Sequence, residues 1–220
     1  MPGLKKHYSD VRFSGNKVTP DEIDMRRQYT ILYPSVGAAT VGTLAAGTVA
    51  AAWTIVDTKL DYPRNVLFSV AGPSGGVGGT CTLNGSNQFG VSIQETVTIA
   101  SANAGGTAAG TKIFDTVTSG TYYPNGVDNT STATVGYAFG TAAGYVGLFG
   151  LPVRIGATSD VKRVTRIFNG VRSAINGGTI AGYIGTANHT FADPTVGSAT
   201  NCYVIDILSS YNSENDVSVG

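Results

Sequence analysis

Short runs of Val, Ile, Thr, Tyr and Phe fill the chain from Ala46 onward, and Gly, Pro or Asn interrupts them at short intervals. β-Branched and aromatic residues favour strands, and closely spaced turn residues are typical of a sandwich or a barrel. The sequence therefore predicts an all-β fold. Three pairs supply the positive-φ residues that tight turns require, namely Asn84-Gly85, Asn125-Gly126 and Asn169-Gly170. We expect strands over Val49–Val56, Asn65–Ala71, Thr80–Leu83, Val91–Ala100, Lys112–Thr118, Thr132–Phe139, Val161–Phe168, Ile180–Ile184 and Cys202–Leu208.

The clearest alternation lies in the segment from Val91 to Ala100. One face is apolar and carries a single acid, Glu95, while the other face is polar and uncharged. The apolar residues are Val91, Ile93, Val97 and Ile99, and the polar ones are Ser92, Gln94, Thr96 and Thr98. A buried carboxylate is costly unless a cation or several donors meet it. We therefore predict a structural ion pair between Glu95 and Arg64, with Lys112 as the second candidate; a bulge or an exposed strand end would instead turn Glu95 outward.

The N-terminal segment has a different composition. Ten charged residues lie between Lys5 and Arg27, and the segment has too few apolar residues to fold alone. Thr19 followed by Pro20 and two acids predicts the start of a short helix. We expect residues 1–45 to form an extended arm and linker that lies across another protein chain, followed by one β domain over residues 46–220. The predicted partner-binding residues of the arm are Lys5, Lys6, Arg12, Lys17, Arg26 and Arg27.

Charge is sparse in the middle of the chain. Between Arg64 and Arg154 the only charged residues are Glu95, Lys112, Asp115 and Asp128. The whole chain is 13% charged, whereas an ordinary soluble domain is roughly a quarter charged. An uncharged polar surface suits burial against other protein, so the composition favours a structural subunit of a homo-oligomer over an enzyme. The net charge is zero, which favours neither nucleic acid nor anionic lipid as a partner.

Catalytic and cofactor motifs do not emerge from the sequence. His7 and His189 are the only histidines, and no Gly-x-Ser-x-Gly motif accompanies them. The glycine-rich stretch from Gly72 to Thr80 lacks the lysine of a phosphate-binding loop. Candidate acids for glycoside hydrolysis are scattered. They are Asp57, Asp61, Glu95, Asp115 and Asp128. We expect no catalytic, cofactor-binding or metal-binding residues.

Three other features have ordinary explanations. Cys81 and Cys202 have no metal or redox spacing and are expected to be buried free thiols. The charge-free stretch from Val36 to Val56 is rich in Ala, Gly and Thr, which favours a loop and strand over a membrane span. A basic cluster divides between two strand faces, which does not favour a nucleic-acid track. The cluster comprises Arg154, Lys162, Arg163, Arg166 and Arg172, with Asp160 among them.

Four stretches resemble virion proteins of tailed bacteriophages. They are Asp61-Tyr-Pro-Arg-Asn-Val-Leu-Phe-Ser-Val70, Asn84-Gly-Ser-Asn-Gln-Phe-Gly-Val-Ser-Ile-Gln-Glu-Thr-Val-Thr-Ile99, Gly110-Thr-Lys-Ile-Phe-Asp-Thr-Val117 and Gly147-Leu-Phe-Gly-Leu-Pro152. The resemblance implies a jelly-roll-like β-sandwich. It also implies a protein that decorates or cements a capsid shell, commonly as a trimer. It implies the major capsid protein or another virion protein as partner, and a virion location after assembly in the host cytoplasm.

Other functions stay open at this stage. A tail-tip, fibre or baseplate protein that binds host glycans would use exposed aromatic side chains. The tyrosines available for this are Tyr122, Tyr123, Tyr137, Tyr145, Tyr183 and Tyr211. A polysaccharide depolymerase would need two close carboxylates in a cleft. A tail-tube subunit would close its sheets into a ring of many copies.

Overall fold

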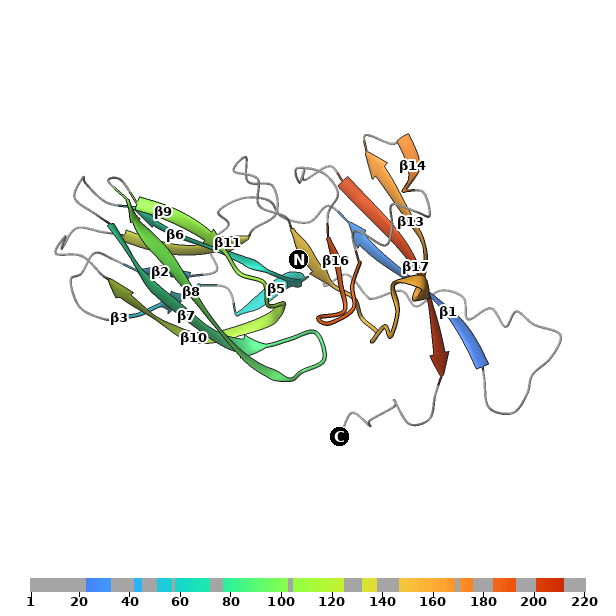
Figure 1. Ribbon diagram of the computed structural model, residues 1–220, viewed down its shortest axis with the longest axis horizontal. Coiled ribbons are helices and arrows are strands. Elements are labelled where there is room, and N and C mark those ends of the chain that lie inside the picture. The colour runs from blue at the N-terminus through green and yellow to red at the C-terminus, as the bar shows by residue number, and fades with distance from the viewer. Residues whose placement is uncertain are drawn as a thin grey trace.

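The computed structural model describes residues 23–32, 42–44, 51–56, 58–71, 77–102, 105–124, 132–137, 147–168, 171–175, 184–192 and 201–211. Within these ranges the chain forms antiparallel β-sheets and one short 3-10 turn, Thr158–Asp160. The all-β prediction is therefore confirmed. The strands gather into two lobes, which Figure 1 shows side by side.

Two sheets build the first lobe, here called the sandwich lobe. One runs in the order β4-β2-β11-β6-β9. Its strands are β2 (Gly42–Leu44), β4 (Thr54–Ile55), β6 (Val66–Ala71), β9 (Gly105–Ala109) and β11 (Thr132–Tyr137). The opposing sheet contains β3 (Ala51–Ala52), β5 (Lys59–Arg64), β7 (Val77–Ser86), β8 (Ser92–Ala102) and β10 (Phe114–Pro124).

The second lobe combines a separate sheet with one end of the sheet that holds β5. The separate sheet has the order β1-β17-β13-β14. Its strands are β1 (Ile23–Leu32), β13 (Val161–Phe168), β14 (Val171–Ile175) and β17 (Asn201–Tyr211). The remaining strands, β12 (Leu148–Gly150), β15 (Ile184–Gly185) and β16 (Thr190–Ala192), continue the β5 sheet beyond the sandwich in the order β15-β16-β12-β5.

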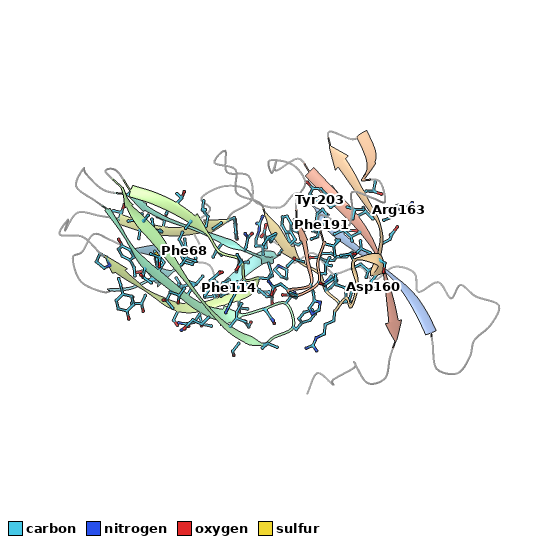
Figure 2. All side chains as sticks on the ribbon, viewed as in Figure 1. Phe68, Phe114, Asp160, Arg163, Phe191 and Tyr203 are labelled. Carbon is cyan, nitrogen blue, oxygen red and sulfur yellow. The ribbon has the colours of Figure 1, made fainter. Side chains whose placement is uncertain are left out.

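Each lobe has its own apolar core. Phe68 of β6 and Phe114 of β10 bring the two sheets of the sandwich lobe together, and Phe191 and Tyr203 pack in the second lobe (Figure 2). These four side chains are fully buried. Because apolar residues alternate with polar ones along β7, Cys81 and Leu83 face the core of the sandwich lobe while the residue between them faces outward. The two lobes therefore fold around separate interiors while sharing one continuous sheet.

Most expected strands lie where the alternation places them, and β13 has the bounds that the sequence predicts. The sequence does not predict three other strands, namely β5, which contains Pro63, the glycine-rich β9 and the short β12. The expected turn at Asn84-Gly85 is wrong: both residues lie inside β7, opposite Gln94 and Ile93 of β8. The chain reverses a few residues later, where Gly90 has a φ of +76°. The other two expected turns lie outside the described residues.

The expected N-terminal arm needs a correction. Residues 23–32 form β1, which pairs along its whole length with β17, from Ile23 opposite Tyr211 to Leu32 opposite Cys202. Ile31 is fully buried in the second core. A segment with this register belongs to the folded body, as does β2, so the boundary expected at residue 45 is too late. The helix start at Thr19 lies outside the described residues.

Candidate functional site: an uncharged sheet face

The outer face of β10, β7 and β8 is an array of uncharged polar side chains. Cys81 and Leu83 of β7 point into the core, so the residues between and beside them point outward. The register aligns these outward residues in four rows across the three strands. The rows are Thr116–Ser86–Ser92, Ser119–Asn84–Gln94, Thr121–Thr82–Thr96 and Tyr123–Thr80–Thr98. We call these twelve residues the polar face.

Hydrogen bonds between neighbouring strands hold the polar face in place. Ser86 Oγ lies 2.6 Å from Thr116 Oγ1, and Thr82 Oγ1 lies 3.1 Å from Thr96 Oγ1. In the second row, Gln94 Nε2 donates to Asn84 Oδ1 at 2.7 Å, and Asn84 Nδ2 donates to the Ser119 hydroxyl at 3.2 Å. Cross-strand polar pairs of this kind stabilise a sheet and restrict side-chain rotamers. The face is therefore ordered before any partner arrives.

Charges lie at the margins of the polar face. Lys59 and Asp115 form an exposed ion pair beside the first row. On the side of β8, Lys112 Nζ donates to the backbone oxygen of Gln94 at 2.6 Å. A lysine at a strand edge disfavours pairing with a further strand. Contacts with this sheet are accordingly expected on its flat face rather than along the β8 edge.

Glu95 lies on the inner side of β8 and is 6% exposed, as the alternation predicts. Its expected ion pair with Arg64 is wrong. Glu95 Oε1 instead accepts hydrogen bonds from the backbone N–H groups of Thr111 and Lys112 at 2.6 and 3.0 Å, and from the Thr111 hydroxyl at 3.3 Å. A Cβ at Gly110 would overlap this carboxylate, so a larger residue there would displace the Glu95 side chain. Glu95 thus fixes the connection that leads from β9 into β10.

Arg64 lies where the shared sheet passes from one lobe to the other, opposite Phe114 of β10 and Phe149 of β12. The residue is only 1% exposed, and its guanidinium packs over the rings of Tyr137 at 4.1 Å and Phe149 at 5.0 Å. Its Nη1 donates to Asp61 Oδ1 at 2.7 Å. Burial lowers the pKa of Arg64, while the nearby Asp61 raises it. Arg64 therefore joins the two cores and does not neutralise Glu95.

The structure describes only some of the predicted basic residues. Lys5, Lys6, Arg12 and Lys17 lie outside the described residues, while Arg26 and Arg27 lie in β1. Arg163 pairs with Asp206 at 2.8 Å. Arg154 lies over the Phe89 ring, and Asp160 accepts hydrogen bonds from the N–H groups of Gly156 and Ala157. Lys162, Arg166 and Arg172 lie in β13 and β14.

Tyrosines do not form an exposed row on the described strands. Among the candidate tyrosines whose side chains the structure describes, Tyr122 and Tyr137 are buried core residues and Tyr123 is exposed, at 53%. Tyr145 and Tyr183 lie outside the described residues, and Tyr211 lies at the end of β17. Among the candidate acids, Asp61 and Asp115 are in ion pairs, Glu95 is buried, and Asp57 and Asp128 lie outside the described residues.

Both cysteines are free and buried, as predicted. Burial raises the pKa of the Cys81 thiol to about 12 and also raises that of Cys202. Within the described ranges, no group of three or more His, Cys, Asp or Glu side chains could hold a metal ion. No helix in the same ranges has the length and apolar character needed to cross a membrane.

The β8 part of the polar face can be predicted from its alternation, but the sequence analysis does not identify the parts on β7 and β10. Alternation around Cys81 and Leu83 was the available signal on β7. On β10 a register shift between Val117 and Ser119 interrupts the period.

Comparison of the chain with family models, with curated proteins and with solved structures finds no match.

Proposed function

We propose that this protein is a non-enzymatic virion structural protein of the capsid decoration or cement type, and that it contacts the capsid through the polar face. The observation that supports this is four in-register rows of side chains that can donate and accept hydrogen bonds and carry no charge. The free-energy cost of desolvating such a face is smaller than that of a charged face, because no ion has to leave water. The resemblance to tailed-bacteriophage virion proteins points to the major capsid protein or another virion protein as the partner.

The size of the face bears on how it would bind. Three strands at about 4.8 Å spacing and four rows at about 7 Å spacing give on the order of 400 Å². A stable protein–protein interface needs about 800 Å² on each partner. The polar face is therefore one contact of several, as expected for a subunit held in a repetitive shell. Further copies of the chain, in a trimer, would supply the remaining area.

The same proposal includes the finer fold and the location. Pairing of β5 with β10 and of β6 with β11 brings together strands that are distant in sequence, as in Greek-key and jelly-roll sheets. The β7–β8 hairpin is a local pairing beside them. Two free buried thiols are consistent with assembly in a reducing host cytoplasm and incorporation into the virion.

A second candidate is a tail-tip, fibre or baseplate protein that binds host glycans. The exposed Tyr123 at one end of the polar face favours it, because aromatic rings stack on sugars and hydroxyl and amide groups bond to them. One exposed ring among the three candidate tyrosines whose side chains are described is a modest platform. We therefore place this function second, followed by the tail-tube subunit.

Quantitative mass spectrometry of purified virions that contain this chain separates these functions. A decoration protein is expected in hundreds of copies that scale with the major capsid protein. A tail-tip protein would be present in a handful of copies. A tail-tube subunit would also be abundant, but it would fractionate with detached tails rather than with heads. Absence of the chain from washed particles would overturn the proposal.

A further inference from the structure

The tip of the β7–β8 hairpin, residues 87–90, is a rigid projection. Asn87 Oδ1 accepts hydrogen bonds from the backbone N–H groups of Phe89 and Val91, both at 3.0 Å. The Asn87 N–H donates to the Val91 oxygen at 2.9 Å, and the Gly90 N–H donates to the Asn87 oxygen at 3.0 Å. An Asn side chain that bonds to its own turn in this way fixes the turn geometry. Phe89 is therefore presented in a defined position.

This tip reaches from the sandwich lobe to the second lobe. Gln88 Nε2 donates to the backbone oxygen of Asn188 at 3.1 Å. The Phe89 ring meets the His189 ring edge to face, with centroids 5.5 Å apart, and the Arg154 guanidinium lies 5.3 Å from the Phe89 centroid. We call this set of contacts the interlobe contact. A Cβ at Gly150 would approach the Gln88 side-chain amide to 3.0 Å, so glycine lets the hairpin sit this close.

His189 connects the interlobe contact to the interior of the second lobe. Its backbone has a φ of +51°, and its carbonyl accepts a hydrogen bond from the Leu151 N–H at 2.8 Å. Its side-chain Nδ1 accepts from the N–H of the buried Ile155 at 3.2 Å. Nδ1 can accept only when it carries no proton, which assigns the neutral ring with its proton on Nε2. One imidazole thus holds both the segment 151–155 and the Phe89 ring.

We propose that the interlobe contact fixes the angle between the two lobes and is released in acid, when His189 takes up a proton at Nδ1. The added N–H would point at the Ile155 N–H, so one buried hydrogen bond would be lost. The new positive charge would also lie near Arg154, the one charged group that the described residues 87–90, 151–155 and 185–190 present to it. Release would let the hairpin tip move away from the second lobe.

The direction of the pH dependence follows from the neutral ring. Burial lowers the pKa of His189 below its ordinary value and outweighs the hydrogen bond with the Ile155 backbone, which raises it, while the charge of Arg154 also lowers it. Because the pKa of His189 is lower in the folded state than in the unfolded chain, the neutral ring contributes its full stabilisation at pH values above about 6.5. The contribution is lost as the pH falls through the folded-state pKa. The lobes are therefore expected to stay fixed at neutral pH and to loosen in mildly acidic solution.

The test is a pH titration of the full chain by two methods. Amide NMR spectra follow the Ile155 and Phe89 signals, and small-angle scattering follows the radius of gyration. The proposal expects both amide signals to shift with one midpoint below pH 6.5, and the radius to increase over the same range. A titration that moves the signals with no change in radius would show that the lobes stay fixed, and would overturn the release.

Two variants make the titration specific. His189→Asn keeps an acceptor near the Nδ1 position, tolerates positive φ and cannot be protonated. Its amide signals and radius are expected to be independent of pH down to about pH 4.5, below the ordinary histidine range. His7→Asn removes the only other histidine and is expected to behave like the wild type. An acid transition that persists in His189→Asn, or that vanishes in His7→Asn, would assign the effect to another group. Phe89→Ala, expected to have the larger radius at every pH, tests the contact if His189→Asn does not fold.

Discussion

Replacing Glu95 by Ala removes the acceptor that fixes the connection from β9 to β10. The three hydrogen bonds to Oε1 come from Thr111 and from the Lys112 backbone. A hydrogen bond to a charged group contributes about 1.5–3 kcal/mol. Thr111 and Lys112 are themselves exposed, so water can replace part of what is lost. We expect Glu95→Ala to lower the free energy of unfolding by about 2–3 kcal/mol.

The matched control is Glu95→Gln, which keeps a carbonyl oxygen at the position of Oε1. Its expected cost is below about 1 kcal/mol, since the two backbone N–H groups retain an acceptor. For a chain of this size, 1 kcal/mol moves the melting temperature by about 2–4 °C. Calorimetry should therefore show a decrease of about 5–10 °C for the Ala variant and a much smaller one for the Gln variant.

Hydrogen exchange gives the local result. The amides of Thr111 and Lys112 should lose protection in Glu95→Ala and keep it in Glu95→Gln. An unchanged melting temperature in the Ala variant would refute the argument. Equal destabilisation of both variants would also refute it, because the effect would then come from side-chain volume or charge rather than from the lost acceptor.

Three further expectations concern buried groups. Asp61→Ala should lower the free energy of unfolding by about 3 kcal/mol, because it removes the carboxylate paired with the buried Arg64 cation. Arg64→Met should lower it by only about 1 kcal/mol, because Met removes the charge and keeps the packing. Denaturant unfolding measures both values. Cys81 should not react with a thiol reagent at pH 8 in the folded protein, since burial raises its pKa to about 12, and should react on unfolding. Tyr122→Phe should cost about 1 kcal/mol in thermal unfolding, because its hydroxyl donates to the buried Gly78 oxygen at 2.9 Å.

Alternation allowed prediction of strands that bury one face, and β13 and the inward position of Glu95 follow from it. Pairing partners could not be predicted in this way. The segment ahead of Arg64 was not recognised as a strand, although its bulged pairing places Arg64 between two cores. The sequence predicts a cation as the partner of Glu95 because charged side chains are visible in it, whereas the actual partners are two backbone N–H groups and the Thr111 hydroxyl. The charged composition of residues 23–32 obscures that Tyr29 and Ile31 of β1 pack in the second core.

The polar face is also only partly evident from sequence. Ser92, Gln94, Thr96 and Thr98 can be identified by their period along one strand. Their neighbours on β7 and β10 become neighbours only through register, which depends on a shift between Val117 and Ser119. A one-residue slip would move each strand's polar set to the other side of the sheet. The face is thus a property of the pairing rather than of any single segment.

The most direct test of the central claim places one charge in the polar face. Thr96→Lys inserts an ammonium in the third row, and Thr54→Lys places the same charge on an exposed residue of the opposing sheet. The measurement is the occupancy of each variant on virions assembled without the wild-type chain, after circular dichroism has shown that both variants fold. Burying an unpaired ammonium costs several kcal/mol, so Thr96→Lys is predicted to lower occupancy by at least about tenfold while Thr54→Lys leaves it unchanged. Equal, full occupancy of both variants would contradict the proposal that this face contacts the virion.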